Sequence, residues 1–193
     1  CKFTSFILTM NLIIDIGTGN VRAAVAENNG HILGVESGPA VYERDTHYPE
    51  SIYFSPDALW KQISELTRSV LQKLDSVQIT AITATSQREG IVVLDQNGNS
   101  LLGMPNIDHR GREWEDTILD KNEVYRLTGR YPTSLFSALK LVGLKKRLPE
   151  IWEKVHTFTS ISDWAQFKLS GVVGYEHSQA SETLLYDVAA KQW

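Results

Sequence analysis

Asp15-Ile16-Gly17-Thr18-Gly19-Asn20-Val21-Arg22 forms a glycine-containing turn between two short apolar runs, Leu12–Ile16 and Val21–Ala26. Both runs have the length of a β-strand. The two glycines around a threonine can leave backbone N–H groups facing an anion instead of pairing within a sheet. An aspartate ends the first run and an arginine follows the turn. The segment therefore has the residues of a phosphate-binding turn, with a carboxylate beside it for a hydrated metal ion. An ordinary glycine-containing hairpin is the alternative that the turn alone leaves open.

The composition excludes several classes of protein. Of 193 residues, 42% are hydrophobic and 22% charged, which is typical of a globular chain that buries one sizeable core. The net charge is −4, and the basic cluster Lys145–Arg147 better complements a helix C-terminus than binds nucleic acid. One cysteine permits no internal disulfide, and no apolar run is long enough to span a membrane. We therefore expect a cytoplasmic protein that binds neither nucleic acid nor membrane.

The two ends of the sequence carry further expectations. Met10 stands directly before the first predicted strand, so we expect it to be the natural start and residues 1–9 to be an upstream extension. Residues 186–193 have the character of mid-domain sequence without a closing signal. We therefore expect the chain to be truncated.

The order of the predicted elements indicates a mixed α/β fold. A three-strand meander up to Gly38-Pro39 precedes a helix that Pro56-Asp57 opens. The apolar, β-branched run 77–85 predicts a buried strand, parallel to the first because a helix precedes it. A hairpin at Ile91–Met104 makes the sheet partly antiparallel, unlike the uniform alternation of a dinucleotide-binding fold.

The second half of the chain is predicted to be mainly helical. Residues 112–121 and 123–127 are candidate helices, and Thr128-Gly129 should end the second. Ser162 is expected to cap a helix over Trp164–Leu169. The five histidines show no metal-ligand spacing.

Polar side chains suited to a ligand follow two predicted strands. Ser86–Gly90 lies at the C-terminal end of the predicted parallel strand, where open α/β sheets place ligand sites. Arg88 and Glu89 can donate to and accept from the hydroxyls of a sugar or polyol. A local salt bridge is the alternative. Asp108 follows another strand, where it would line the same cleft or cap the helix that starts near Arg110.

Taken together, these segments resemble the FGGY carbohydrate kinases. The glycine turn looks like the opening of that family, and Ser86–Gly90 with the following hairpin resembles its sugar-contact segment. The similarity covers Asn11 to Trp193, and several ordered landmarks over that length are more specific than any one of them. The later landmarks that match in order are Thr128-Gly129, Leu139-Lys140, Ser162-Asp163-Trp164 and Ser170-Gly171.

Within the family, the chain most resembles the autoinducer-2 kinases, through residues 84–92, 106–110 and 122–129. Glycerol kinases share the Gln-Arg-Glu triplet but have a tyrosine where Leu135 stands, and xylulokinases usually have Met-His at the Arg-Glu pair. Glu176 stands where the family commonly has an aspartate.

The resemblance implies an actin-like ATPase (ribonuclease-H-like) α/β domain with a mixed five-stranded sheet flanked by helices. Residues 10–193 would be the N-terminal, sugar-binding domain of an ATP-dependent kinase that acts on a small sugar or polyol, most like the autoinducer-2 precursor dihydroxypentanedione. Xylulose and glycerol are the alternative substrates, and a homodimer is compatible with this interpretation. The catalytic aspartate and the adenine pocket would lie in a C-terminal domain beyond Trp193, so the 193-residue chain alone is expected to be inactive.

The resemblance also implies a role for individual residues, with ATP and Mg²⁺ as the cofactors. The turn would hold the phosphates, Arg22 would neutralise the γ-phosphoryl charge, and Asp15 would hold Mg²⁺ through water. The residues assigned to the cofactors are Asp15, Gly17, Thr18, Gly19, Asn20 and Arg22. Those assigned to the sugar are Gln87, Arg88, Glu89 and Asp108.

Two functions of other classes remain open at this stage. An actin-like ATPase that works as a chaperone or activator would use the same phosphate turn, but it leaves Arg88-Glu89 unexplained. A non-catalytic sugar-sensing or interaction module would use both.

Overall fold

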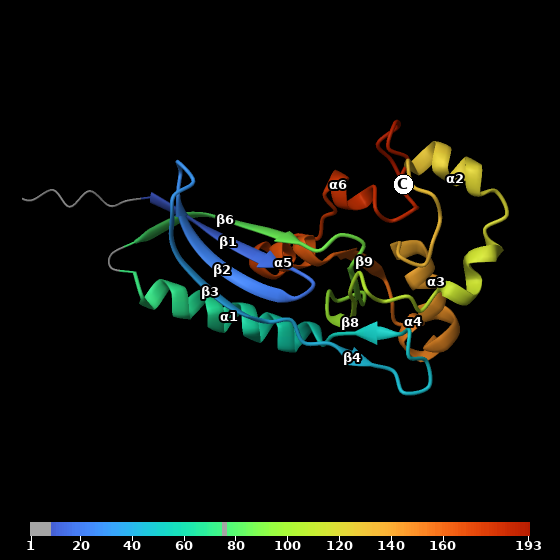
Figure 1. Cartoon of the computed structure of the whole chain (residues 1–193), viewed down its shortest axis with the longest axis horizontal. Helices are drawn as coiled ribbons and strands as arrows, with labels where there is room; N and C mark the ends of the chain where they lie inside the picture. Colours follow the sequence, from blue (N-terminus) through green and yellow to red (C-terminus); the bar gives the residue numbers. More distant parts are fainter. Residues whose placement is uncertain (1–8, 75–76) are drawn as a thin grey trace, which may run out of the picture.

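The computed structural model describes residues 9–74 and 77–193, so all but the last residue of the expected upstream extension 1–9 lies outside the described residues. Its main sheet has four strands in the order β3-β2-β1-β6 (Figure 1). The antiparallel meander and the parallel return of the last strand are confirmed. The strands are β1 (Thr9–Ile16), β2 (Asn20–Glu27), β3 (Ile32–Pro39) and β6 (Gln78–Ser86).

Helix α1 (Pro56–Gln72) makes the crossover between β3 and β6, and it begins at Pro56, as the sequence predicts. Ser55 caps its N-terminus by accepting a hydrogen bond from the Ala58 N–H, and Pro56 occupies the first turn. Ile63 and Val70 are buried on the face that packs against β2 and β3. Burial of each such side chain stabilises the fold by about 1.5–3 kcal/mol.

The largest core cluster lies between the main sheet and two helices, α1 and α5 (Ile161–Ser170). Ile14 and Ile16 of β1 point into it, whereas Ile13 points to the opposite, half-exposed face of the sheet. Trp164 of α5 is fully buried and meets Trp60 of α1 edge to face, with ring centroids 6.1 Å apart. One face of the sheet is therefore packed by helices while the other stays partly exposed.

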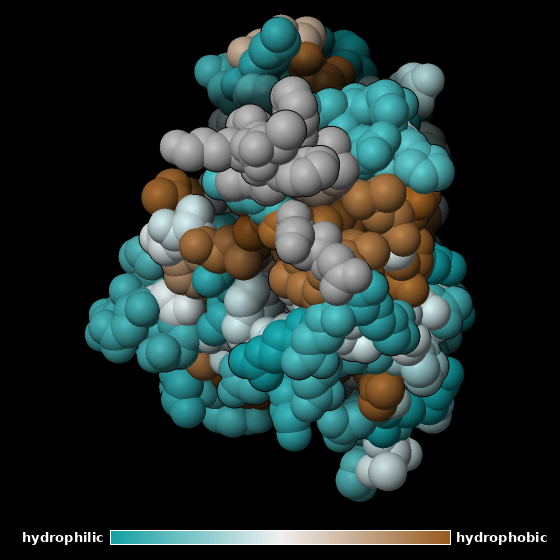
Figure 2. Space-filling view, turned by 90° about the vertical axis from the view of Figure 1, so that its left-hand side faces the viewer, coloured by the Kyte–Doolittle hydropathy of each residue, from teal (hydrophilic) through white to brown (hydrophobic). Residues whose placement is uncertain are grey.

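Hydrophobic surface also gathers at the end of the molecule where β1 begins (Figure 2). A smaller buried cluster underlies this end of the sheet, where Met10 and Leu12 pack with Val70 from the last turns of α1. No helix within residues 9–74 and 77–193 is long and apolar enough to cross a lipid bilayer.

The expected single five-stranded sheet is wrong in its strand count. A second, antiparallel sheet has the order β8-β7-β9, and a two-stranded sheet pairs β4 with β5. The division follows from residues 87–90, where the chain leaves β6 and Glu89 adopts a positive φ of 61°. The fold remains mixed α/β. These strands are β4 (Glu43–Arg44), β5 (Ile52–Tyr53), β7 (Ile91–Leu94), β8 (Ser100–Met104) and β9 (Thr157–Ser160).

The helical half of the chain differs from expectation at its first predicted helix. The predicted helix 112–121 is instead a short 3₁₀-helix, η1 (Arg112–Thr117), because Asp120 caps a new helix by accepting from the Glu123 N–H. That helix, α2 (Lys121–Thr128), ends at Gly129 in the left-handed conformation, as predicted. The remaining helices, at the end of the molecule away from the start of β1 (Figure 1), are α3 (Ser137–Arg147), α4 (Pro149–Trp152) and α6 (His177–Ala180).

Two further expectations fail for local reasons. Ser160, not Ser162, caps α5, because Ser160 has extended backbone angles and its Oγ lies 3.0 Å from the Asp163 N–H. The run 77–85 is a strand but not a buried one: Ile82 is 46% exposed, since β6 pairs only with β1 among the described residues.

Candidate functional site

The glycine turn and the segment after β6 meet at one edge of the main sheet. β1 and β6 are parallel and in register, with Ile16 opposite Ser86. The Gln87 N–H donates a hydrogen bond of 2.9 Å to the Ile16 carbonyl. Because both strands end there, the two predicted ligand segments, 17–20 and 87–90, lie next to each other.

The turn itself is a tight hairpin between β1 and β2. The Gly17 N–H donates to the Asn20 carbonyl at 2.9 Å, and the Ala40 N–H donates to the Gly19 carbonyl at 3.0 Å. A Cβ atom at Gly17 would lie 3.1 Å from the Asn20 oxygen, so the close turn favours glycine there. Gly19 and Asn20 are exposed. The hairpin that the sequence left as an alternative is therefore present, and it presents its tip to solvent.

Asp15 and Arg22 face each other across the first two strands. Their side chains form an ion pair of 2.8 Å and are 37% and 45% exposed. An exposed pair of this kind is held weakly, so either partner can turn to a ligand at small cost. A single carboxylate suits Mg²⁺, which keeps most of its water ligands. Among residues 9–74 and 77–193, no group of three or more His, Cys, Asp or Glu side chains could hold a metal ion.

Arg88 and Glu89 present opposite charges at the end of β6. The Arg88 side chain is 67% exposed, whereas Glu89 is half-buried. Burial, and to a lesser extent the nearby Glu182 carboxylate, raise the pKa of Glu89 above its usual range, although Arg88 opposes this. A positive φ is uncommon for a residue with a side chain and often marks a functional position. The pair has the chemistry to donate to and accept from hydroxyls of a ligand.

Two residues that sequence reasoning missed complete this charge cluster. The Glu182 carboxylate, 4% exposed, accepts hydrogen bonds from Arg130 Nε at 2.8 Å and Nη2 at 2.5 Å. Its Oε1 atom also lies 3.5 Å from Arg88 Nη1. Arg130 is 52 residues from Glu182 in the sequence, and no motif links them. The departure at Glu176 from the aspartate expected there, six residues before Glu182, was the nearest signal.

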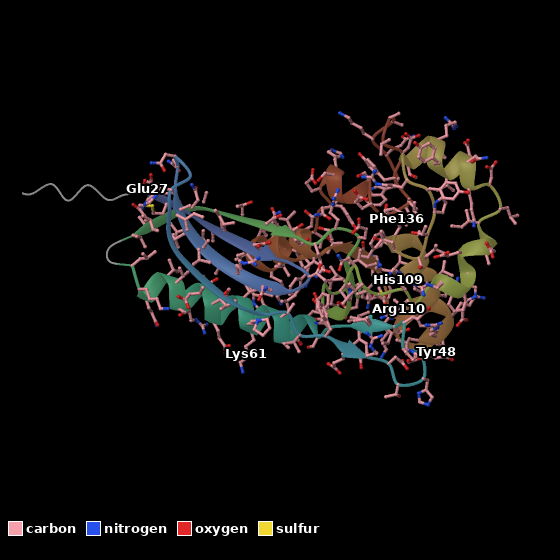
Figure 3. All side chains as sticks on the ribbon, viewed as in Figure 1. Glu27, Tyr48, Lys61, His109, Arg110 and Phe136 are labelled. Carbon is pink, nitrogen blue, oxygen red and sulfur yellow. The ribbon has the colours of Figure 1, made fainter. Side chains whose placement is uncertain are left out.

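Asp108 does not present its carboxylate to solvent and caps no helix. It is fully buried, where it accepts from Arg110 Nε at 2.7 Å and from the Ile52 N–H at 2.8 Å. Figure 3 shows Arg110 and His109 between the sheets and the helical end of the molecule. Lys140 reaches the same region, because its buried Nζ donates to the Asp108 carbonyl at 2.8 Å. The carboxylate of Asp108 is therefore engaged by the protein and does not face a ligand in this structure.

Gln87 is also buried, directly before the exposed pair. Its Nε2 donates to the Tyr42 hydroxyl at 3.0 Å, and its Oε1 accepts from the Asn106 N–H at 2.9 Å. Both polar ends of the side chain are thus engaged by the protein.

The fold is that of the actin-like, ribonuclease-H-like domain found in sugar kinases. A ligand-bound xylulose kinase from Lactobacillus acidophilus superposes with a TM-score of 0.85 over 96% of this chain and 38% of that one; at 19% identity this likeness shows the fold alone. Glycerol kinase from Plasmodium falciparum, solved with ADP, gives a TM-score of 0.81 at 26% identity, over 96% of this chain and 39% of that one.

Residues 10–193 match the N-terminal domain of the FGGY family of carbohydrate kinases, and the chain belongs to that family. It is 56% identical over 182 residues to a protein named "Putative sugar kinase YoaC" from Bacillus subtilis (strain 168), covering 94% of this chain and 37% of that protein. The predicted similarity to autoinducer-2 kinases is confirmed: the Salmonella paratyphi A enzyme is 32% identical over 192 residues, covering 94% of this chain and 36% of the enzyme. The chain thus spans little more than a third of the length of these relatives.

Proposed function

We propose that the protein containing this domain transfers a phosphoryl group from ATP to a hydroxyl of a small sugar or polyol. The observation that carries the proposal is the shared edge of the sheet, where the glycine turn adjoins the Arg88–Glu89 pair. Phosphoryl transfer depends mainly on positioning and on neutralising charge, and these two segments offer one group of residues for each reactant.

On the phosphate side, the exposed tip of the turn would receive the nucleotide. Thr18, Gly19 and Asn20 would bind phosphate oxygens, while the Gly17 N–H keeps the turn closed. Arg22 would leave Asp15 and pair with the γ-phosphoryl group. Mg²⁺, held by Asp15 through water, would supply further neutralisation of the phosphate charge.

On the sugar side, Arg88 would donate to a hydroxyl oxygen and the Glu89 carboxylate would accept from a hydroxyl proton. Glu182 and Arg130 would hold Arg88 near its working position, and Gln87 and Asp108 would support the segment from within. For the substrate, we favour the autoinducer-2 precursor dihydroxypentanedione over xylulose or glycerol. The 32% identity to the Salmonella paratyphi A autoinducer-2 kinase, over 94% of this chain, supports this choice.

Replacing both residues of the pair tests the assignment of the sugar site. In the full-length protein, the double replacement Arg88→Ala and Glu89→Ala should lower sugar-dependent phosphoryl transfer at least about 100-fold. Two charge-assisted hydrogen bonds would be lost, each contributing about 1.5–3 kcal/mol. Arg126→Ala with Glu123→Ala is the matched control, because this Arg–Glu pair lies on the exposed surface of α2. Unchanged kinetics in the Arg88–Glu89 variant would remove the assignment.

A further inference from the structure

Four residues from separate parts of the chain form a closed ring of hydrogen bonds between the two halves of the site. Tyr42 Oη donates to the Thr18 carbonyl at 2.9 Å and accepts from Gln87 Nε2 at 3.0 Å. Gln87 Oε1 accepts from the Asn106 N–H at 2.9 Å, and Thr18 Oγ1 donates to Asn106 Oδ1 at 3.1 Å. Each residue therefore contacts two others, and the ring has no open end.

The ring connects the segments that the proposed reaction must hold together. Thr18 belongs to the phosphate turn, and Gln87 directly precedes the Arg88–Glu89 pair. Asn106 follows β8, and Tyr42 comes from the connection between β3 and β4. Tyr42 and Asn106 are thus the two members that lie outside the segments assigned to phosphate and hydroxyl binding.

The Tyr42 ring is packed against apolar neighbours. It packs edge to face against the buried Phe54, with centroids 6.4 Å apart, and lines an apolar cavity of about 200 Å³ beside Ile16. Burial raises the pKa of Tyr42, so the hydroxyl keeps its proton at neutral pH and can donate to the Thr18 carbonyl. Removing the oxygen alone would leave this packing in place.

We propose that Tyr42 is a positioning residue for phosphoryl transfer, which acts by fixing the phosphate turn at a set distance from the hydroxyl-binding pair. This inference rests on the proposed function. Without the ring, the pairing of β1 with β6 and the hydrogen bond from the Gln87 N–H to the Ile16 carbonyl would still join the two segments, but neither contact holds Thr18 itself. Those contacts would still hold Arg88–Glu89 in place for sugar binding, while the turn could shift. A misplacement of about 1 Å between reacting groups can cost about 100-fold in rate.

Tyr42→Phe in the full-length protein tests the role through the separation of kcat from KM. We expect kcat to fall about tenfold, as for the loss of one or two hydrogen bonds, while the KM for the sugar changes less than about twofold. Tyr53→Phe is the matched control, because Tyr53 of β5 pairs with Glu43, the residue after Tyr42, and its hydroxyl donates to the exposed Glu43 carboxylate. The control should keep both constants.

A second variant asks whether the ring acts as a unit. Asn106→Ala breaks the ring at another point. The double variant Tyr42→Phe with Asn106→Ala should therefore have a kcat little lower than that of the more impaired single variant. Losses that multiply would show two independent contacts and overturn the proposal, as would a normal kcat in Tyr42→Phe. If the wild-type protein shows no sugar-dependent phosphoryl transfer, the proposed function and this role are both refuted. If the wild-type protein is active and Tyr42→Phe has the same kcat, the role of Tyr42 alone is refuted.

Discussion

Glu182→Gln is the substitution that probes the charge cluster behind the sugar-binding pair most sharply. Gln keeps the shape of the side chain but removes its charge and replaces one acceptor oxygen with an NH₂ group, which donates and does not accept. Two hydrogen bonds from Arg130 and the 3.5 Å approach of Arg88 depend on the Glu182 carboxylate. The variant therefore weakens three charge interactions without opening a cavity.

The size of the effect follows from the burial of the two partners. Breaking a fully buried ion pair costs about 3–5 kcal/mol. Here Glu182 is 4% exposed but Arg130 is 39% exposed, so water can solvate the released guanidinium and the cost falls. We expect the free energy of unfolding to decrease by about 1–2 kcal/mol, between the values for exposed and buried pairs. The pKa of Glu89 should also fall, because the Glu182 charge contributes to raising it.

Chemical denaturation followed by tryptophan fluorescence measures the change, and Glu123→Gln provides the control. Glu123 binds Arg126 through two hydrogen bonds of 2.7 Å, a similar arrangement in which both partners are exposed. That variant should lose less than about 0.5 kcal/mol. Equal losses in the two variants would refute the argument that burial of Glu182 gives its pair its strength.

Two further predictions concern stability. Burial lowers the pKa of Lys140 from 10.5 to about 8, so between these pH values the unfolded chain binds more protons than the folded one, and the free energy of unfolding should rise with pH across that interval. Lys140→Met should lack this rise in denaturation curves taken from pH 7 to 10. The same dependence of the free energy on pH in both proteins would contradict the assignment. Gly129→Ala should lower the free energy of unfolding by about 1 kcal/mol, because Gly129 ends α2 with a φ of 70°. Gly174→Ala should leave the free energy of unfolding unchanged, because Gly174 has open space around it and no positive φ. Equal shifts of the melting temperature in the two variants would contradict this reasoning.

Local signals allowed several elements to be predicted from the sequence alone. A helix end is a local event, so Pro56 at the start of α1 and Gly129 at the end of α2 were placed correctly. The parallel return of β6 followed from the helix before it, and this relation brought the two ligand segments to one edge of the sheet.

Features that depend on distant residues could not be predicted. Glu182 meets Arg130 and Arg88 only after the chain has folded, and neither spacing has a period or motif. Asp108 follows a strand as a cleft residue would, but its burial with Arg110 depends on the approach of Ile52. The chain leaves the main sheet near Glu89, which has a positive φ. The residue preferences of glutamate do not indicate such a backbone conformation.

An assay of phosphoryl transfer by the full-length wild-type protein is the most direct test of the central claim, that the phosphate turn and the Arg88–Glu89 pair form one site for ATP and a sugar. The protein would be incubated with ATP, Mg²⁺ and, in separate reactions, dihydroxypentanedione, xylulose, glycerol and related polyols, and sugar phosphate would be detected by mass spectrometry. We predict that at least one of these substrates is phosphorylated and that ATP consumption rises when it is present. ATP hydrolysis at the same rate with and without every sugar, with no phosphorylated product, would contradict the account and favour an actin-like ATPase of another class.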